Sequence, residues 1–189
     1  TMSRANVLYG VTIGADGALT PMFAPTVATE TGPVSVTVDP AGRYAYVANY
    51  LSNNVSPYTI GLNSQLMAID CDPTAMGTQA CTAGDGPASV TVDPSGRYAY
   101  VANAGSNTVS QYMIGADGAL AAMSPSTAAG RAGPASLSLA RGTRAVAAVP
   151  RYAYVANYDG NNVSQYTIGS NGALAEIAPA VGTGAGPRS

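Results

Sequence analysis

The 189-residue sequence contains no histidine, no lysine and no tryptophan, so its eight positive charges are all arginine. Without histidine the chain lacks the commonest general base and zinc ligand, and it cannot build a Ser–His–Asp triad. Clustered basic charge is also missing, and the formal net charge is −2. Because phosphate binding depends on concentrated Lys and Arg, we expect no nucleic-acid partner.

Long apolar runs and nucleotide-binding motifs are absent too. No apolar stretch approaches the roughly 20 residues of a membrane span, and the first ten residues lack the apolar centre of a signal peptide. The glycine run at 182–187 has neither the Lys nor the Ser/Thr of a phosphate loop. No serine stands in a G-x-S-x-G elbow. We therefore expect no membrane span, no cofactor and no metal.

The only two cysteines, Cys71 and Cys81, lie ten residues apart. Paired zinc ligands are usually closer together and are joined by a second pair or by histidine. A disulfide that closes a short loop is therefore favoured over two free thiols. A disulfide implies an oxidising compartment, so the expected location is extracytoplasmic, meaning periplasmic, secreted or at the cell surface.

What the sequence has in abundance is repetition. The nine residues GRYAYVANY at 42–50 return almost unchanged at 96–103 and 151–158, at intervals of 54 residues. The Gly-Pro pairs before these copies are unevenly spaced, and two seven-residue insertions explain the difference. One insertion falls in the cysteine loop and the other at 140–150. The underlying unit is therefore about 47 residues long.

Each unit contains four segments with the pattern of short strands, separated by turn residues. Clear examples are 87–92, which ends in the turn sequence DPSG, then 97–103, and in the next unit 163–169, which a glycine turn joins to a short fourth strand. Four strands in 40–50 residues are typical of one blade of a β-propeller. Because side chains alternate along a strand, we expect the tyrosines of one blade to pack against the alanines of the next.

The sequence thus predicts an all-β fold of propeller blades, each with four antiparallel strands, in an incomplete ring. Three and a half blades fall short of the usual four to eight, and an open ring exposes strand edges and apolar faces. Two completions are possible: head-to-tail self-association into a dimer, or the missing remainder of a longer propeller. The predicted segments are a partial blade with strands three and four at 1–31, a blade with the Cys71–Cys81 loop at 32–85, a blade at 86–132, a blade with the inserted segment 140–150 at 133–185, and the start of a next blade at 186–189.

Repetition also separates structural from functional residues, because a residue found in every blade serves the blade. Asp39 and Arg43, with their copies, flank one turn and indicate a cap or ion pair, and the Asn of each YVAN sequence is expected to bond backbone groups at a bend. Among unrepeated residues, Asp70 and Asp72 are more typical of a solvated loop than of a cation site. The candidates for contact with an anion or ligand cluster around the second insertion and are Arg131, Arg141 and Arg144.

The stretch RYAYVANYDGNNVSQYTIGSNGAL at 151–174 resembles the YVTN-repeat proteins, which are similar to seven-bladed lactonase-type propellers. YVAN stands where that family often has YVTN, and the resemblance covers Val7 to Pro187. The resemblance implies a propeller fold. The family includes 6-phosphogluconolactonase-like enzymes, whose activity is attributed to polar and charged residues, histidine among them, at one end of the channel. Because this chain has no histidine, no catalytic residue is carried over.

The sequence therefore favours a non-catalytic, extracytoplasmic propeller that acts as a binding, surface or assembly module. The alternatives are a lactonase-like hydrolase and a propeller subunit of a larger complex. A hydrolase would need carboxylates and arginines gathered at the mouth of the channel. Those side chains are the ones to locate in the structure.

Overall fold

The computed structural model describes residues 6–62, 64–71, 80–141 and 150–188. These residues form strands and turns, and none of them forms a helix that could cross a membrane. The strands are β1 (Val7–Ile13), β2 (Leu19–Ala28), β3 (Pro33–Val38), β4 (Tyr44–Asn49), β5 (Asn54–Ile60), β6 (Leu66–Ala68), β7 (Cys81–Thr82), β8 (Pro87–Val92), β9 (Tyr98–Asn103), β10 (Thr108–Ile114), β11 (Leu120–Ala129), β12 (Pro134–Arg141), β13 (Pro150–Asn157), β14 (Asn162–Ile168) and β15 (Leu174–Gly182).

The strands form four antiparallel sheets. β1 and β2 make a two-stranded sheet, whereas β8 to β11 and β12 to β15 each make a four-stranded sheet in chain order. The remaining sheet runs β3–β4–β5–β6, and β7 pairs with the other part of β5. Each sheet falls within one predicted repeat segment. The predicted all-β class of incomplete propeller is confirmed.

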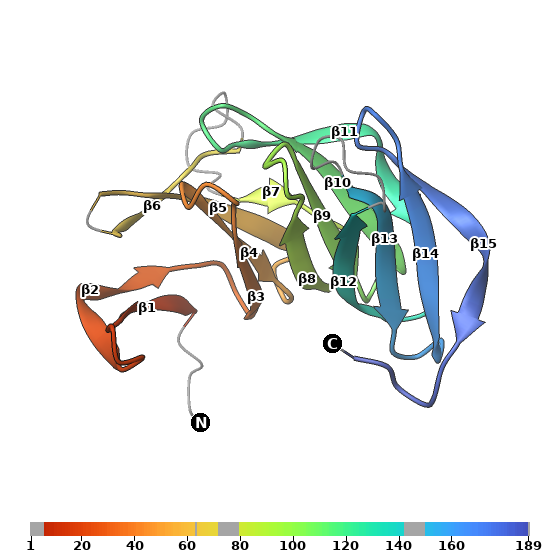
Figure 1. Ribbon diagram of the computed structural model, residues 1–189, viewed down its shortest axis with the longest axis horizontal. Coiled ribbons are helices and arrows are strands. Elements are labelled where there is room, and N and C mark those ends of the chain that lie inside the picture. Colours follow the sequence, from red (N-terminus) through yellow and green to blue (C-terminus); the bar gives the residue numbers. More distant parts are fainter. Residues whose placement is uncertain (1–5, 63, 72–79, 142–149, 189) are drawn as a thin grey trace.

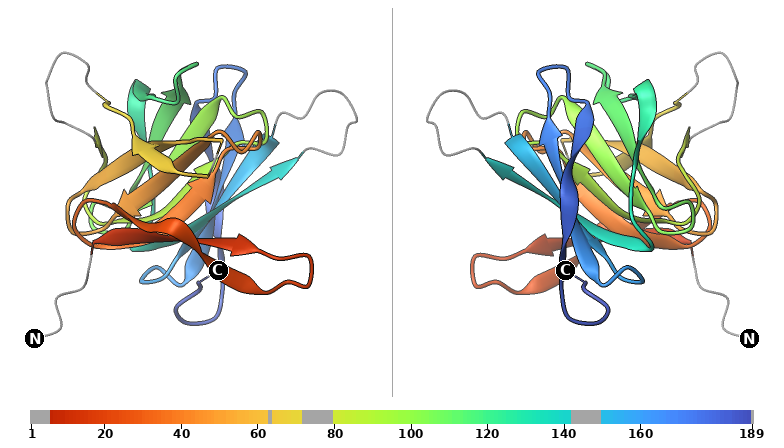
Figure 2. Two further views of the ribbon diagram at one scale, coloured as in Figure 1. Left: turned by 90° about the vertical axis from the view of Figure 1, so that its left-hand side faces the viewer. Right: turned by 90° about the vertical axis from the view of Figure 1, so that its right-hand side faces the viewer.

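The sheets follow one another around a partial ring (Figure 1). The first strands of the three full sheets, β3, β8 and β12, lie next to one another on the inner side of this ring. β8 packs against both β3 and β12. Outer strands such as β11 and β15 lie on the far side of their sheets (Figure 1). The side views show successive sheets twisted relative to one another (Figure 2). The inner strands would therefore line the central channel of a closed ring.

The seams between blades have the predicted composition, in which tyrosines of one sheet face small residues of the next. Alternation along the second strand of each blade places tyrosines on one face and Ala and Val on the other. The large tyrosine side chains of one sheet then pack against the small Ala and Val side chains of the next sheet, and both sets become buried. The two complete seams pack Tyr44 and Tyr46 against Ala99 and Val101, and Tyr98 and Tyr100 against Ala153 and Val155.

Tyrosine hydroxyls bond across the same seams. The Tyr46 hydroxyl donates to the Gly118 carbonyl at 3.0 Å, and the Tyr100 hydroxyl donates to the Gly172 carbonyl at 2.7 Å. In the opposite direction, the Tyr112 hydroxyl donates to the outer strand of the preceding blade at 2.6 Å. Burial raises the pKa of Tyr112 to about 12 and also raises the pKa values of Tyr46 and Tyr100. All three therefore remain protonated donors at neutral pH.

Two kinds of turn residue position the inner strands. Asp39 Oδ1 accepts the backbone N–H of Tyr44 at 2.9 Å and that of Arg43, so the predicted cap is confirmed. The Asn in the turn after each YVAN sequence has a positive φ, as expected of that residue type. Its side chain also bonds the glycine of the following Gly-Pro pair. Asn53 Oδ1 accepts the N–H of Gly86 before β8, Asn107 Oδ1 that of Gly133 before β12, and Asn161 Oδ1 that of Gly186.

Two expectations about local structure were wrong. The fourth strand is short only in the blade with the cysteine loop, where β6 has three residues and β7 two, whereas β2 and β11 each have ten residues and β15 has nine. An outer edge strand tolerates proline because its outward N–H groups need no partner within the sheet. The Asn that ends YVAN does not chiefly bond backbone groups. Its Nδ2 donates instead to a Ser hydroxyl on the next strand in each blade, at 2.8–2.9 Å in Asn49, Asn103 and Asn157.

Candidate functional site

The inner strands carry no charged side chain over β3, β8 and residues 134–140 of β12. Their hydroxyl groups connect neighbouring blades. Ser35 Oγ accepts the N–H of Val90 at 3.3 Å, and Thr91 Oγ1 donates to the Leu137 carbonyl at 3.0 Å. These bonds satisfy edge groups that have no strand partner on the channel side. Charged chemistry in this part of the chain must therefore come from the two ends of the inner strands.

We call these two ends the Gly-Pro end and the hairpin end. The Gly-Pro end is where β3, β8 and β12 begin, at Gly32, Gly86 and Gly133, together with the turns that follow β4, β9 and β13. The hairpin end is the opposite one, with the turn after each inner strand and the glycine turns between third and fourth strands. Because the blades repeat the same strand directions, corresponding turns of successive blades lie at the same end.

Charged residues at the hairpin end are repeated and serve the turns. Asp93 Oδ1 accepts the N–H groups of Arg97 and Tyr98, both at 2.8 Å, as Asp39 does in the preceding blade. In the glycine turns, Asp117 Oδ1 accepts the N–H two residues ahead at 3.1 Å, and Asn171 makes the same bond at 3.1 Å. A neutral Asn can thus replace the Asp, so the charge at this position is not needed for the turn.

Charged residues at the Gly-Pro end differ from blade to blade. The position of Asp159, for example, is occupied by Leu51 and Gly105 in the other two blades. A residue that differs between blades of the same fold is not needed to build a blade. Such residues are therefore the candidates for function. All are exposed. This set, which we call the Gly-Pro charges, consists of Glu30, Asp85, Arg131, Asp159 and Arg188.

The backbone holds several of the Gly-Pro charges in fixed places. The Asp85 carbonyl accepts the N–H of Gly105 at 2.9 Å and that of Ser106 at 3.1 Å. The Asp159 carboxylate lies so close to Gly133 that a Cβ at that glycine would collide with it. Asp85 and Asp159 therefore present their carboxylates from ordered turns at one end of the inner strands.

The predicted arginine cluster has one member that pairs with an acid. Arg131 donates from Nη2 and Nε to Glu176 Oε1 on β15, at 2.8 and 3.1 Å. The side chains of this pair are 42% and 32% exposed, so the pair contributes little to stability. Arg141 ends β12, and its side chain lies outside the described part, as does the whole of Arg144. Contact of this cluster with an anion stays a prediction.

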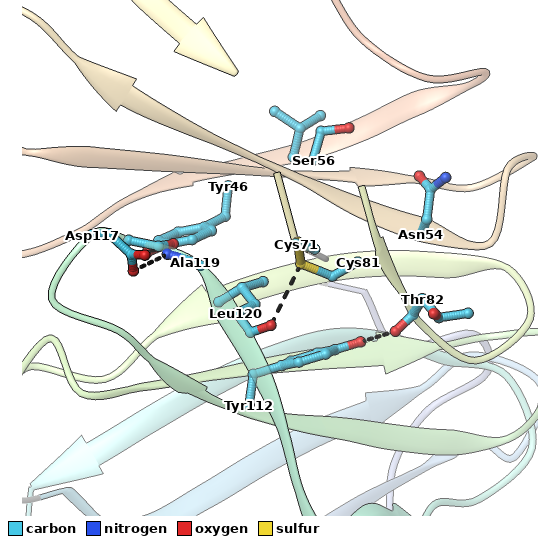
Figure 3. The surroundings of a disulfide bond; sticks show 12 residues. Tyr46, Asn54, Ser56, Cys71, Cys81, Thr82, Tyr112, Asp117, Ala119 and Leu120 are labelled. Atoms are coloured by element: carbon cyan, nitrogen blue, oxygen red, sulfur yellow. Dashed lines mark hydrogen bonds between the residues drawn. A yellow bond between two sulfur atoms is a disulfide. The ribbon is translucent and has the colours of Figure 1, made fainter. Parts of the chain in front are cut away.

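The structure joins Cys71 and Cys81 in a disulfide with a Cα–Cα distance of 5.2 Å. Cys81 belongs to the buried cluster of the seam between the second and third sheets, beside Leu120 and Tyr112 (Figure 3). The bond ties β7 to the segment that follows β6. We therefore assign it a structural role within the seam. Over the described residues, no group of three His, Cys, Asp or Glu side chains could hold a metal ion.

Comparison with known proteins supplies a family. A family model described as "Lactonase, 7-bladed beta-propeller" matches residues 7–150. No curated protein matches the sequence.

Three solved structures share the fold at low sequence identity. A candidate 6-phosphogluconolactonase from Bacteroides uniformis is 19% identical with a TM-score of 0.78, and 95% of this chain covers 49% of that one. Another from Bacteroides fragilis is 17% identical with a TM-score of 0.76, and the covered shares are 94% and 49%. The periplasmic gluconolactonase of Pseudomonas aeruginosa is 21% identical with a TM-score of 0.65, and the shares are 88% and 46%. The chain spans about half the length of these structures.

Proposed function

Because the chain belongs to the family of lactonase-type seven-bladed β-propellers, we propose that it contributes about half of a propeller that hydrolyses a sugar lactone. The similar structures include proteins whose names denote 6-phosphogluconolactonase and gluconolactonase activity. This support places the hydrolase ahead of the non-catalytic module that the sequence favours. The observation that carries the proposal within this chain is that unrepeated carboxylates and arginines stand at the Gly-Pro end of the inner strands.

Lactone hydrolysis needs two kinds of group, and both occur among the Gly-Pro charges. A carboxylate, Asp85 or Asp159 in this proposal, accepts a proton from water while the water oxygen bonds to the lactone carbonyl carbon. Hydrogen-bond donors stabilise the negative charge that develops on the carbonyl oxygen, which arginine can do. The tetrahedral intermediate then collapses, the ring C–O bond breaks, and the released alkoxide takes up a proton. The product is an open-chain hydroxy acid.

The test is hydrolysis of glucono-δ-lactone by the purified chain, followed in a pH-stat with the spontaneous rate subtracted. Loss of a general base typically costs a factor of 10²–10⁴, so we expect Asp85→Asn or Asp159→Asn to lower the rate by roughly 100-fold. Asp117→Asn is the matched control, because Asn171 already makes the same turn in the next blade. A chain with no rate above the spontaneous one would contradict the proposal, as would equal losses in all three variants.

A second candidate, binding without turnover, is favoured by the uncharged inner strands. The described inner-strand hydroxyls bond neighbouring blades, and the repeated Asp residues cap turns. Calorimetry with gluconate distinguishes the two functions. Saturable binding that Asp159→Asn weakens, in a chain that does not hydrolyse the lactone, would support a binding module.

For the location of the protein we propose an extracytoplasmic compartment. The Cys71–Cys81 disulfide supports this, because disulfides persist in oxidising environments. One structural neighbour is described as periplasmic. Trapping of thiols with an alkylating agent at cell lysis tests the proposal: protein that is alkylated without prior reduction would contradict it.

A further inference from the structure

Two surfaces of a kind that is buried in the complete seams are exposed at the two ends of the described chain. One, the tyrosine face, consists of Tyr152 and Tyr154 on β13 and Gln165 on β14. Both tyrosines are 38% exposed, whereas the corresponding tyrosines of the two preceding blades are 8% exposed or less. The other open element is the glycine hairpin, residues 13–19 between β1 and β2.

The preceding blades show what a tyrosine face binds. Tyr46 and Tyr100 donate to glycine carbonyls in the next blade's turn, as described above. Their neighbour two residues earlier reaches the same turn, with Tyr44 donating to the Ala116 carbonyl at 2.6 Å. Gln111 Oε1 accepts the N–H of Leu174, also in the next blade, at 2.6 Å. Gln165 occupies the position of Gln111, so the tyrosine face has three polar groups suited to one glycine turn.

The glycine hairpin is such a turn and lacks the tyrosine that the others have. Its residues IGADGAL are identical to those at 114–120. The ring of Tyr44 lies against Gly118, whereas in the described part of the chain nothing lies within 4 Å of a Cβ built on Gly17. Leu19 is exposed at 63%, and its counterpart Leu120 at 4%.

We propose that the glycine hairpin of one copy docks on the tyrosine face of a second copy, head to tail. In this contact the Tyr152 hydroxyl donates to the Ala15 carbonyl and the Tyr154 hydroxyl to the Gly17 carbonyl. Gln165 accepts the N–H of Leu19, and the Leu19 side chain becomes buried. Two copies joined in this way at both ends carry six full blades and two half-blades, each half-blade made of β1 and β2.

The contact completes the outer half of each joining blade, because β1 and β2 are strands three and four of that blade. Val34, Val36 and Val38 on β3, which are 50–56% exposed, remain uncovered in the assembly. The proposal rests on the seam contacts and holds whether or not the ring hydrolyses a lactone. It is tested without substrate, so its failure is distinct from failure of the hydrolase proposal.

Light scattering coupled to size exclusion tests the proposal, with an expected mass of twice 18.8 kDa. Burying a leucine contributes about 2 kcal/mol, so Leu19→Ser is expected to weaken association by roughly 30-fold per seam. Tyr154→Phe removes one hydrogen bond and is expected to weaken it by roughly fivefold per seam. Leu62→Ser is the matched control, because that leucine is fully exposed outside both faces. Circular dichroism verifies that each variant folds.

A mixing experiment distinguishes a head-to-tail contact from other dimers. Leu19→Asp spoils only the hairpin and Tyr154→Asp only the tyrosine face, so each variant alone is expected to be a monomer. Mixed together, they retain one intact seam and are expected to form a one-to-one dimer. The proposal would be overturned if the unaltered chain is a monomer or has a mass above two copies. It would also be overturned if either variant alone is still a dimer, or if the two variants fail to pair when mixed.

Discussion

The aspartates that cap the two described inner-strand turns differ in the hydrogen bonds to Oδ2, and this difference yields a quantitative prediction. Asp93 Oδ2 accepts bonds from the backbone N–H and the hydroxyl of Ser95. In the preceding blade, Ala41 occupies the position of Ser95, and Asp39 Oδ2 is buried without a hydrogen-bond partner among the described residues. It has instead Arg43 Nε at 3.5 Å, from a side chain that is 58% exposed. Such an exposed pair contributes little.

The expected free-energy changes follow from the cost of an unpaired buried acceptor. Removing the hydroxyl with Ser95→Ala takes one of the two donors from Asp93 Oδ2 and leaves the backbone N–H, which costs about 1 kcal/mol of unfolding free energy. Adding a hydroxyl with Ala41→Ser supplies a donor to Asp39 and is expected to stabilise the protein by about 1 kcal/mol. The two substitutions interchange the same pair of residues at equivalent turns, so each is the control for the other.

Urea unfolding followed by circular dichroism measures both changes as shifts of the midpoint at constant m-value. Stabilisation by Ala41→Ser together with destabilisation by Ser95→Ala is the predicted result. Two results would contradict the prediction: destabilisation by Ala41→Ser, or a change of less than about 0.5 kcal/mol in unfolding free energy with Ser95→Ala. Either would mean that a hydroxyl donor to this carboxylate oxygen does not stabilise the fold.

Three further predictions concern pH, the disulfide and the blade connections. The unfolding free energy should be level between about pH 6 and 9, because there is no histidine. It should fall above about pH 10, because the unfolded chain loses its phenolic protons before the buried tyrosines do, each adding a slope of about 1.4 kcal/mol per pH unit; urea titrations at each pH measure this, and a level profile up to pH 12 would refute it. Reduction of Cys71–Cys81 should cost about 2–3 kcal/mol. Adding a reductant should therefore lower the urea midpoint of the unaltered chain, but it should not change the midpoint of a Cys71→Ser, Cys81→Ser double variant. Asn107→Gly keeps the positive φ but loses the acceptor for Gly133, so it should cost about 1 kcal/mol in the same assay; a neutral result would show that this bond does not hold the next blade.

Most of the blade could be predicted from the sequence because repeated local rules determine it. Alternation of Tyr with Ala and Val in the second strand fixes which face meets which. DPxG and Asn-containing turns have local signatures that require no tertiary information. The long fourth strand was missed because its residues are poor strand formers, and it is stabilised by pairing with the third strand rather than by its own propensity.

The candidate site was harder to predict because its residues are far apart in the sequence and share no motif. Comparison of the blades could reveal Glu30, Asp85 and Asp159 as unrepeated, but only strand direction shows that they share one end of the inner strands. Arg131 was predicted as a contact for an anion, and in the structure it pairs with Glu176 on an outer strand 45 residues away. Side-chain pairing of this kind depends on the packing of two blades and leaves no local signal.

In the proposed function, the Gly-Pro end rather than the hairpin end is the functional end. Two-dimensional amide NMR of the chain titrated with gluconate, the stable hydrolysis product, tests it most directly. We predict saturable shifts at the amides of Gly32, Gly86 and Gly133 and in the turns beside them, with the amides of Gly42 and Gly96 unmoved. Shifts confined to the hairpin end, or no shifts at all at millimolar gluconate, would contradict the claim.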